Sequence, residues 1–173
     1  MKKHFLLLLL IPFFAGCDML SELTKIDLPL SQSITIPQAT PKNVETVITT
    51  PDVETGIESI LASYNVTTDL IQSVSFKEMK LTSTTGNMTF LKNLEIWISA
   101  DGLDDKKIAW VTDVPETTGT SITLTVSNDD LQTFILKDKF KLKFKTTTDK
   151  DLTANQDITI DMKFTIDLKV LGL

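Results

Sequence analysis

Arginine is absent from the sequence, and histidine and cysteine occur once each, at His4 and Cys17. Without a histidine beyond position 4, the rest of the chain cannot assemble a Ser-His-Asp or Cys-His catalytic group. Zinc sites nearly always take His or Cys ligands, and bidentate recognition of phosphate takes arginine, so both are disfavoured. A single cysteine also excludes a disulfide within the chain. The enzymatic route that remains is carboxylate chemistry, such as the acid pair of a glycosidase, and no local motif supports it. We therefore predict no enzymatic activity and no cofactor.

Positive charge is scarce as well, because 17 lysines stand against 23 acidic residues and give a net charge of −6. This balance opposes binding to nucleic acid, so we expect no nucleic-acid partner. The longest apolar run, Phe5 to Phe14, is far shorter than the ~20 residues that a membrane-spanning helix needs. We therefore expect no transmembrane segment.

The N-terminus has the layout of a signal peptide. Lys2 and Lys3 precede the apolar run, and the small residues Ala15 and Gly16 follow it. The run Phe14-Ala15-Gly16-Cys17 resembles the lipobox of bacterial lipoproteins, although the family usually has Leu where this chain has Phe14. The resemblance implies that residues 1–16 are removed and that Cys17 carries two or three acyl chains, which anchor durably where one chain does not. The alternative is an ordinary secreted protein with an accidental cysteine near its cleavage site.

This resemblance also predicts the organisation and the location of the protein. Removal of residues 1–16 from the 173 leaves 157, which suits one domain, with a net charge near −8 from 15 lysines and 23 acids. We expect a lipidated N-terminus and tether over 17–30 and a single domain over 31–173. The expected location is the bacterial cell envelope, at the outer membrane in preference to the inner one, on its periplasmic side or at the cell surface.

The domain shows the period of two that is typical of β-strands. Apolar and polar residues alternate over 94–100, 108–114, 122–126, 140–145 and 158–170, as expected for antiparallel sheets with one dry and one wet face. Ser31–Pro37 and Val44–Thr50 are read as further short strands. The alternation changes phase at Lys77-Glu78, which predicts a β-bulge, and the last strand is long enough to need a bend or a bulge.

The predicted fold is therefore all-β, an antiparallel β-sandwich of about eight strands with one or two short helices. A helical stripe is expected over 53–64, a single turn near Thr68, and a second helix over 128–137 after the acids Asp129 and Asp130. The pattern resembles small, uncharacterised bacterial lipoproteins with an immunoglobulin-like or jelly-roll sandwich, and no motif separates these two topologies.

Trp97 is the first candidate ligand-binding residue, because its strand directs it to the polar face with Glu95 and Ser99. An exposed tryptophan on a flat sheet can stack on a sugar ring. The alternative, which we favour, is that the 128–137 helix or the proline-containing arm covers Trp97. Trp110 shares the parity of Ile108 and is expected in the core.

Two charged groups are further candidates. Asp101, Asp104 and Asp105 form an acidic loop that could hold calcium, but the spacing lacks the EF-hand pattern and Asp-Gly is foremost a turn, which we favour. Four lysines on one strand face could meet anionic lipid or polysaccharide, or form a solvated face: Lys139, Lys141, Lys143 and Lys145. If strands 139–147 and 157–170 pair as a hairpin, Asp161 and Asp167 would partly neutralise them.

These observations favour a membrane-anchored, non-catalytic binding or structural module of the cell envelope. The alternatives are a glycan-binding surface lipoprotein that uses Trp97, and a hydrolase that relies on carboxylates alone. The expected partners are the membrane, through the N-terminal lipid, and an envelope protein or a glycan. The oligomeric state is left open.

Overall fold

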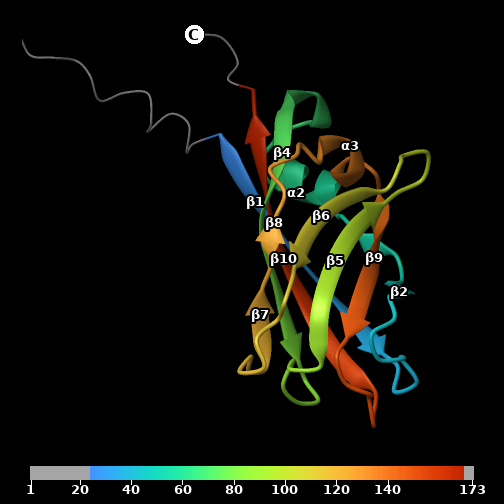
Figure 1. Cartoon of the computed structure of the whole chain (residues 1–173). Helices are drawn as coiled ribbons and strands as arrows, with labels where there is room; N and C mark the ends of the chain where they lie inside the picture. The colour runs from blue at the N-terminus through green and yellow to red at the C-terminus, as the bar shows by residue number, and fades with distance from the viewer. Residues whose placement is uncertain (1–23, 170–173) are drawn as a thin grey trace, which may run out of the picture.

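The computed structural model describes residues 24–169, which form two antiparallel sheets packed face to face (Figure 1). The first sheet has the order β1-β10-β4-β7, with the bounds Lys25–Ile36, Gln156–Leu168, Ile71–Ser83 and Ser121–Thr123. The second has the order β2-β9-β5-β6-β8, with the bounds Thr46–Thr49, Lys139–Thr148, Leu91–Ser99, Lys106–Val111 and Thr125–Val126. The short strand β3 (Val53–Glu54) also pairs with β9. The predicted antiparallel β-sandwich is confirmed.

The strand order is that of a jelly roll, in which the chain passes repeatedly from one sheet to the other, while β5 and β6 form a hairpin within the second sheet. Two of its strands are each split in two. Leu124 separates β7 from β8 where the chain passes from the first sheet to the second, and Pro51 separates β2 from β3. Counting each split strand once gives the eight strands of a jelly roll, in agreement with the predicted number.

Thr50 maintains the sheet next to Pro51, which has no N–H to donate. The backbone N–H of Thr50 donates to the carbonyl oxygen of Leu142 in β9 at 2.9 Å. The N–H of Leu142 in turn donates to the side-chain hydroxyl of Thr50, also at 2.9 Å. A side-chain oxygen therefore accepts a bond that a strand carbonyl would normally accept.

The helices are short. α2 (Ile57–Ser63) buries Ile57 and Leu61, while Val53, which was predicted in the same helix, belongs to β3. The single turn predicted near Thr68 is confirmed as η1 (Thr68–Leu70). The second predicted helix is reduced to α3 (Gln132–Ile135). No helix within residues 24–169 is both long and apolar enough to cross a membrane.

The core lies between the sheets, and aromatic rings link its two sides. Along β10 the predicted alternation holds, because Ile158, Ile160, Met162, Phe164 and Ile166 are all buried. Phe164 stacks on Phe76 of β4 with ring centroids 4.7 Å apart, and it meets Phe140 of the opposite sheet edge-on at 6.4 Å. Phe164 therefore joins the two sheets at the centre of the sandwich.

The predicted bulge in β4 is confirmed. Glu78 pairs with Lys163 and Phe76 pairs with Phe164, which leaves Lys77 as the extra residue. A bulge in β6 was not predicted. Ile96 pairs with Ala109 and Trp97 pairs with Lys107, so Ile108 is extra there.

One prediction about chain organisation is wrong. Residues 25–30 were assigned to the tether, but they lie in β1 and pair with β10 along their length. The condition under which Asp161 and Asp167 would neutralise the lysines, a hairpin of β9 and β10, is not met, because these two strands belong to opposite sheets. Asp161 and Asp167 consequently contact β1 and its flank, where they accept hydrogen bonds from Ser31 and Thr24.

Candidate ligand-binding face

The outward side of strands β2, β9, β5 and β6 carries a group of aromatic and charged side chains, which we call the Trp97 face. Strand alternation creates it, since the intervening residues, such as Ile96, Ile98 and Phe144, point into the core. Strand register arranges the face in two rows that run across the sheet. One row is Val47, Lys145, Glu95 and Trp110, and the next is Thr49, Lys143, Trp97 and Lys107.

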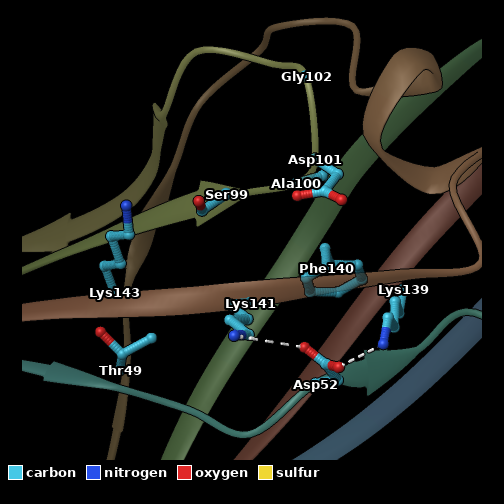
Figure 2. Close-up of a pocket in the computed structure, with 10 residues that line it drawn as sticks. All are labelled: Thr49, Asp52, Ser99, Ala100, Asp101, Gly102, Lys139, Phe140, Lys141 and Lys143. Atoms are coloured by element: carbon cyan, nitrogen blue, oxygen red, sulfur yellow. Dashed lines mark ion pairs between the residues drawn. The ribbon is translucent and has the colours of Figure 1, made fainter.

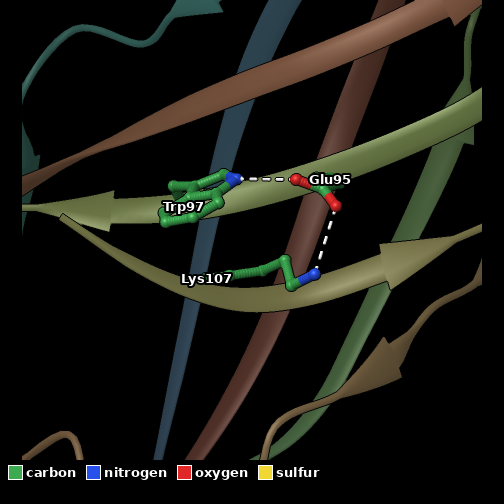
Figure 3. Close-up of polar contacts among 3 residues, drawn as sticks. All are labelled: Glu95, Trp97 and Lys107. Atoms are coloured by element: carbon green, nitrogen blue, oxygen red, sulfur yellow. Dashed lines mark hydrogen bonds and ion pairs between the residues drawn. The ribbon is translucent and has the colours of Figure 1, made fainter.

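Trp97 is half-buried and is held by its own sheet. Its indole N–H donates to Glu95 Oε2 at 3.1 Å. The ammonium of Lys145 lies 4.1 Å from the ring centroid, which is a cation–π contact. Neither contact comes from the 128–137 segment or from the proline-containing arm, the two expected covers. Figure 3 shows the indole in front of β5, with the strands of the other sheet behind it.

Trp110 also belongs to the Trp97 face, so its predicted place in the core is wrong. The bulge at Ile108 reverses the parity of β6, which buries both Ile108 and Ala109 and aligns Trp110 with Glu95. The indole of Trp110 is half-buried, and the ammonium of Lys107 lies 5.4 Å from its centroid. One faint signal of this bulge can be found in the sequence, the adjacent apolar pair Ile108-Ala109.

Glu95 contacts Trp97 directly and is linked to Trp110 through Lys107. One carboxylate oxygen accepts from Trp97, and the other accepts from the ammonium of Lys107 at 3.1 Å (Figure 3). The hydrogen bond from Lys107 lowers the pKa of Glu95 below its ordinary value, and the bond from Trp97 lowers the pKa further against the opposing effect of burial. Glu95 is therefore an ionised acceptor that fixes the orientation of its two neighbours.

An open depression of about 510 Å³ adjoins the second row of the face (Figure 2). Thr49, Ser99 and Asp52 are among the residues that line it. The Asp52 carboxylate lies 2.6 Å from the Lys139 ammonium and 3.7 Å from that of Lys141. The hydrogen bond from Lys139 lowers the pKa of Asp52, and the same contact raises the pKa of Lys139.

The acidic loop does not bring its carboxylates together. Among residues 24–169, no group of three or more His, Cys, Asp or Glu side chains is placed to hold a metal ion. Asp101 and Asp104 are exposed, while Asp105 accepts from Lys143 at 2.6 Å, a bond that lowers the pKa of Asp105. The loop is a turn, as we favoured, with the N–H of Leu103 bonded to the carbonyl of Ala100 and Gly102 at φ +74°.

The lysines of the Trp97 face differ in their partners. Lys139 and Lys141 share Asp52, Lys143 holds Asp105, and Lys107 holds Glu95. In the part of the chain that the structure describes, Lys145 has no carboxylate within 4.0 Å. Its row explains this, because one neighbour is Val47 and the other is Glu95, whose ion pair is with Lys107. Cys17, the predicted lipidation site, lies outside the described residues.

Comparisons with known proteins give distant structural likenesses only. No protein-family model matches the sequence, and no curated protein matches it. Among solved structures, a Nora virus structure has a TM-score of 0.40 at 10% identity over 86% of this chain, which spans 62% of the virus chain. The BFDV capsid protein has a TM-score of 0.36 at 10% identity over 82% of this chain and 99% of its own. The family 32 CBM of C. perfringens NanJ, solved with galactose, has a TM-score of 0.36 at 14% identity over 80% and 99%. Likenesses this low say nothing about function, and the jelly-roll assignment rests on the strand order.

Proposed function

We propose that this chain is a non-catalytic binding module of the bacterial cell envelope, held to a membrane through an acylated Cys17, and that the Trp97 face binds a glycan. The observation that carries the proposal is the pair of half-buried indoles, Trp97 and Trp110, on neighbouring strands of one outer sheet face. Indole rings supply apolar surface for the faces of sugar rings, and they are enriched at binding hot spots. Lysines, Glu95 and the hydroxyls of the adjoining depression supply donors and acceptors for sugar hydroxyls.

The charge state of the face supports a binding role over a catalytic one. A glycosidase needs one carboxyl group with a raised pKa that can donate a proton. The carboxylates of Asp52, Glu95 and Asp105 are ion-paired with lysines, which lower the pKa of each. Each therefore serves as an ionised hydrogen-bond acceptor at neutral pH.

A glycan array followed by calorimetry tests the binding role. The Cys17→Ser chain is screened beside the same chain with Trp97→Ala or with Tyr64→Ala. Tyr64 is the matched control, because it is an aromatic residue, 59% exposed, that follows α2 and lies beside Asp27 and Lys163 of the first sheet. We expect the parent and the Tyr64→Ala chain to bind the same sugars and Trp97→Ala to lose them. Absence of binding to any sugar, or equal binding by all three chains, would contradict the proposal.

The membrane anchor has a separate test. In the native bacterium, the wild-type chain is expected in the membrane fraction, and mass spectrometry should find its N-terminus acylated at Cys17. The Cys17→Ser chain should move to the soluble fraction, since one residue carries the whole anchor. An unmodified thiol, or a serine variant that stays with the membrane, would refute the anchor and leave the binding role untouched.

A further inference from the structure

Building on the proposed function, we propose that the Trp97 face selects saccharides that bear a carboxylate, and that Lys145 recognises this charge. The argument rests on three features of Lys145: its missing carboxylate partner, its place over the indole of Trp97, and the surface around it. Each feature affects the relative affinity of this face for neutral and acidic sugars.

The first feature is that Lys145 alone among the lysines of the face is left for an incoming anion. Within the described residues, the four others each lie within 4.0 Å of a carboxylate: Lys107, Lys139, Lys141 and Lys143. A ligand carboxylate at one of those lysines would have to displace or crowd an acid already there. At Lys145 it would meet an ammonium that lies over the ring of Trp97 and that has no carboxylate within 4.0 Å among the described residues.

The second feature is the place of Lys145 on the ring itself. With its ammonium 4.1 Å from the centroid, Lys145 occupies a face of the indole against which a sugar would stack. A neutral sugar that takes this face must displace the cation and offers no charge in return. A sugar with a carboxylate gives the displaced ammonium a charge-assisted hydrogen bond, which is about twice as strong as a neutral one. Lys145 therefore disfavours neutral sugars and favours acidic ones.

The third feature is the surface around Lys145. Four of the five lysines of the face and its depression contact the carboxylates of Asp52, Glu95 and Asp105, and Asp101 and Glu54 lie near Lys139. The positive charge that an acidic ligand meets at Lys145 is therefore a local feature of a chain whose net charge is −6. Because exposed charges are screened beyond a Debye length of about 8 Å at physiological salt, an acidic ligand responds to the local lysines first. Beside Lys145, the side chain of Val47 is 54% exposed and adds apolar surface to the same row.

The test compares carboxylated sugars with their own methyl esters, which keep the ring and lose the charge. Uronic and sialic acid oligosaccharides and their esters are titrated into the Cys17→Ser chain, and into the same chain with Lys145→Gln. Lys80→Gln is the matched control, because Lys80 is exposed on β4, on the outer face of the other sheet. Poly-glutamate and vesicles of anionic phospholipid serve as non-carbohydrate anions.

For the parent chain we expect the acid to bind about tenfold more tightly than its ester. Lys145→Gln should abolish this preference by changing both affinities. It should bind the acid about two- to fivefold more weakly, because the cation is lost, and the ester about two- to fivefold more tightly, because the indole is uncovered. Lys80→Gln should bind as the parent does. Strengthened ester binding is the diagnostic result, because a variant that had merely lost its fold would bind neither sugar.

Five results would overturn the inference. If acids and esters bind equally, or if Lys145→Gln leaves the preference intact, the charge selection fails while glycan binding stands. If poly-glutamate or the vesicles bind as tightly as the acidic sugars, the face recognises anions in general. If no carboxylated sugar binds but neutral sugars do, the ligand class is wrong. If no sugar of either kind binds, the proposed function fails with it.

Discussion

Replacing Thr50 with valine tests whether one hydroxyl sustains the sheet beside Pro51. Valine has nearly the same shape as threonine, so the substitution removes the acceptor of the Leu142 N–H with little change in packing. Thr50 is 3% exposed and Leu142 is fully buried, so water cannot readily replace the lost acceptor. An unsatisfied buried donor costs about 1–3 kcal/mol, and each kcal/mol lowers the melting temperature of a chain this size by about 2–4 °C. We expect Thr50→Val to melt roughly 2–12 °C below the wild type.

Thr50→Ser is the matched control, because it keeps the hydroxyl and loses only a methyl group, worth about 0.8 kcal/mol. The sharper assay is amide hydrogen exchange followed by NMR, which reports on the Leu142 N–H directly. Its protection should fall in the valine variant and persist in the serine variant. Wild-type protection of Leu142 in Thr50→Val would refute the reasoning, whatever the melting temperatures.

Three further predictions concern the core, the charges and a turn. Phe164→Ala removes the ring that joins the sheets and should cost about 3–5 kcal/mol of unfolding free energy in urea titration, against a smaller loss for Phe164→Leu; equal losses would contradict the assigned stacking. Because the folded-state pKa of Glu95 lies below its ordinary 4.5, its stabilising effect is complete above that pH and is lost as the pH falls through the lowered pKa. Glu95→Gln should therefore be less stable than the wild type by about 0.2–1 kcal/mol at neutral pH and equally stable in acid. A stability difference between the two chains that grows as the pH falls would contradict this prediction. Gly102→Ala places a Cβ at φ +74° and should cost about 1 kcal/mol by thermal melting, whereas Gly119→Ala, with open space and no positive φ, should be neutral; equal effects would rule out backbone strain.

The parts of the fold that could be predicted are those with a local cause. The alternation along β10 reports directly which residues face the core, and the change of phase at Lys77 marks a bulge because charged and apolar residues exchange places there. The bulge at Ile108 is not accompanied by such an exchange of charged and apolar residues. The residues around it are nearly all apolar, so the alternation remained consistent with the wrong face for Trp110.

The candidate site could be predicted only in part, because its partners come from distant strands. The parity of β5 and β9 indicated that Trp97 and the lysines point outward. Which acid each lysine meets depends on the strand order, and β9 lies beside β5 and β2 instead of β10. The contacts of Asp52 and Asp105 with the lysines follow from that order, and so does the lack of a carboxylate within 4.0 Å of Lys145 among the described residues.

The pairing of β1 has a mechanical consequence. All twelve of its residues, Lys25 to Ile36, pair with β10, and the hydrogen bonds of an antiparallel ladder run perpendicular to the strands. A pull on the chain ahead of Lys25, directed along the strand, would load these bonds in shear, so that they resist together instead of opening one after another. The β1–β10 ladder is thus arranged to resist tension applied at the end where the chain enters the sandwich.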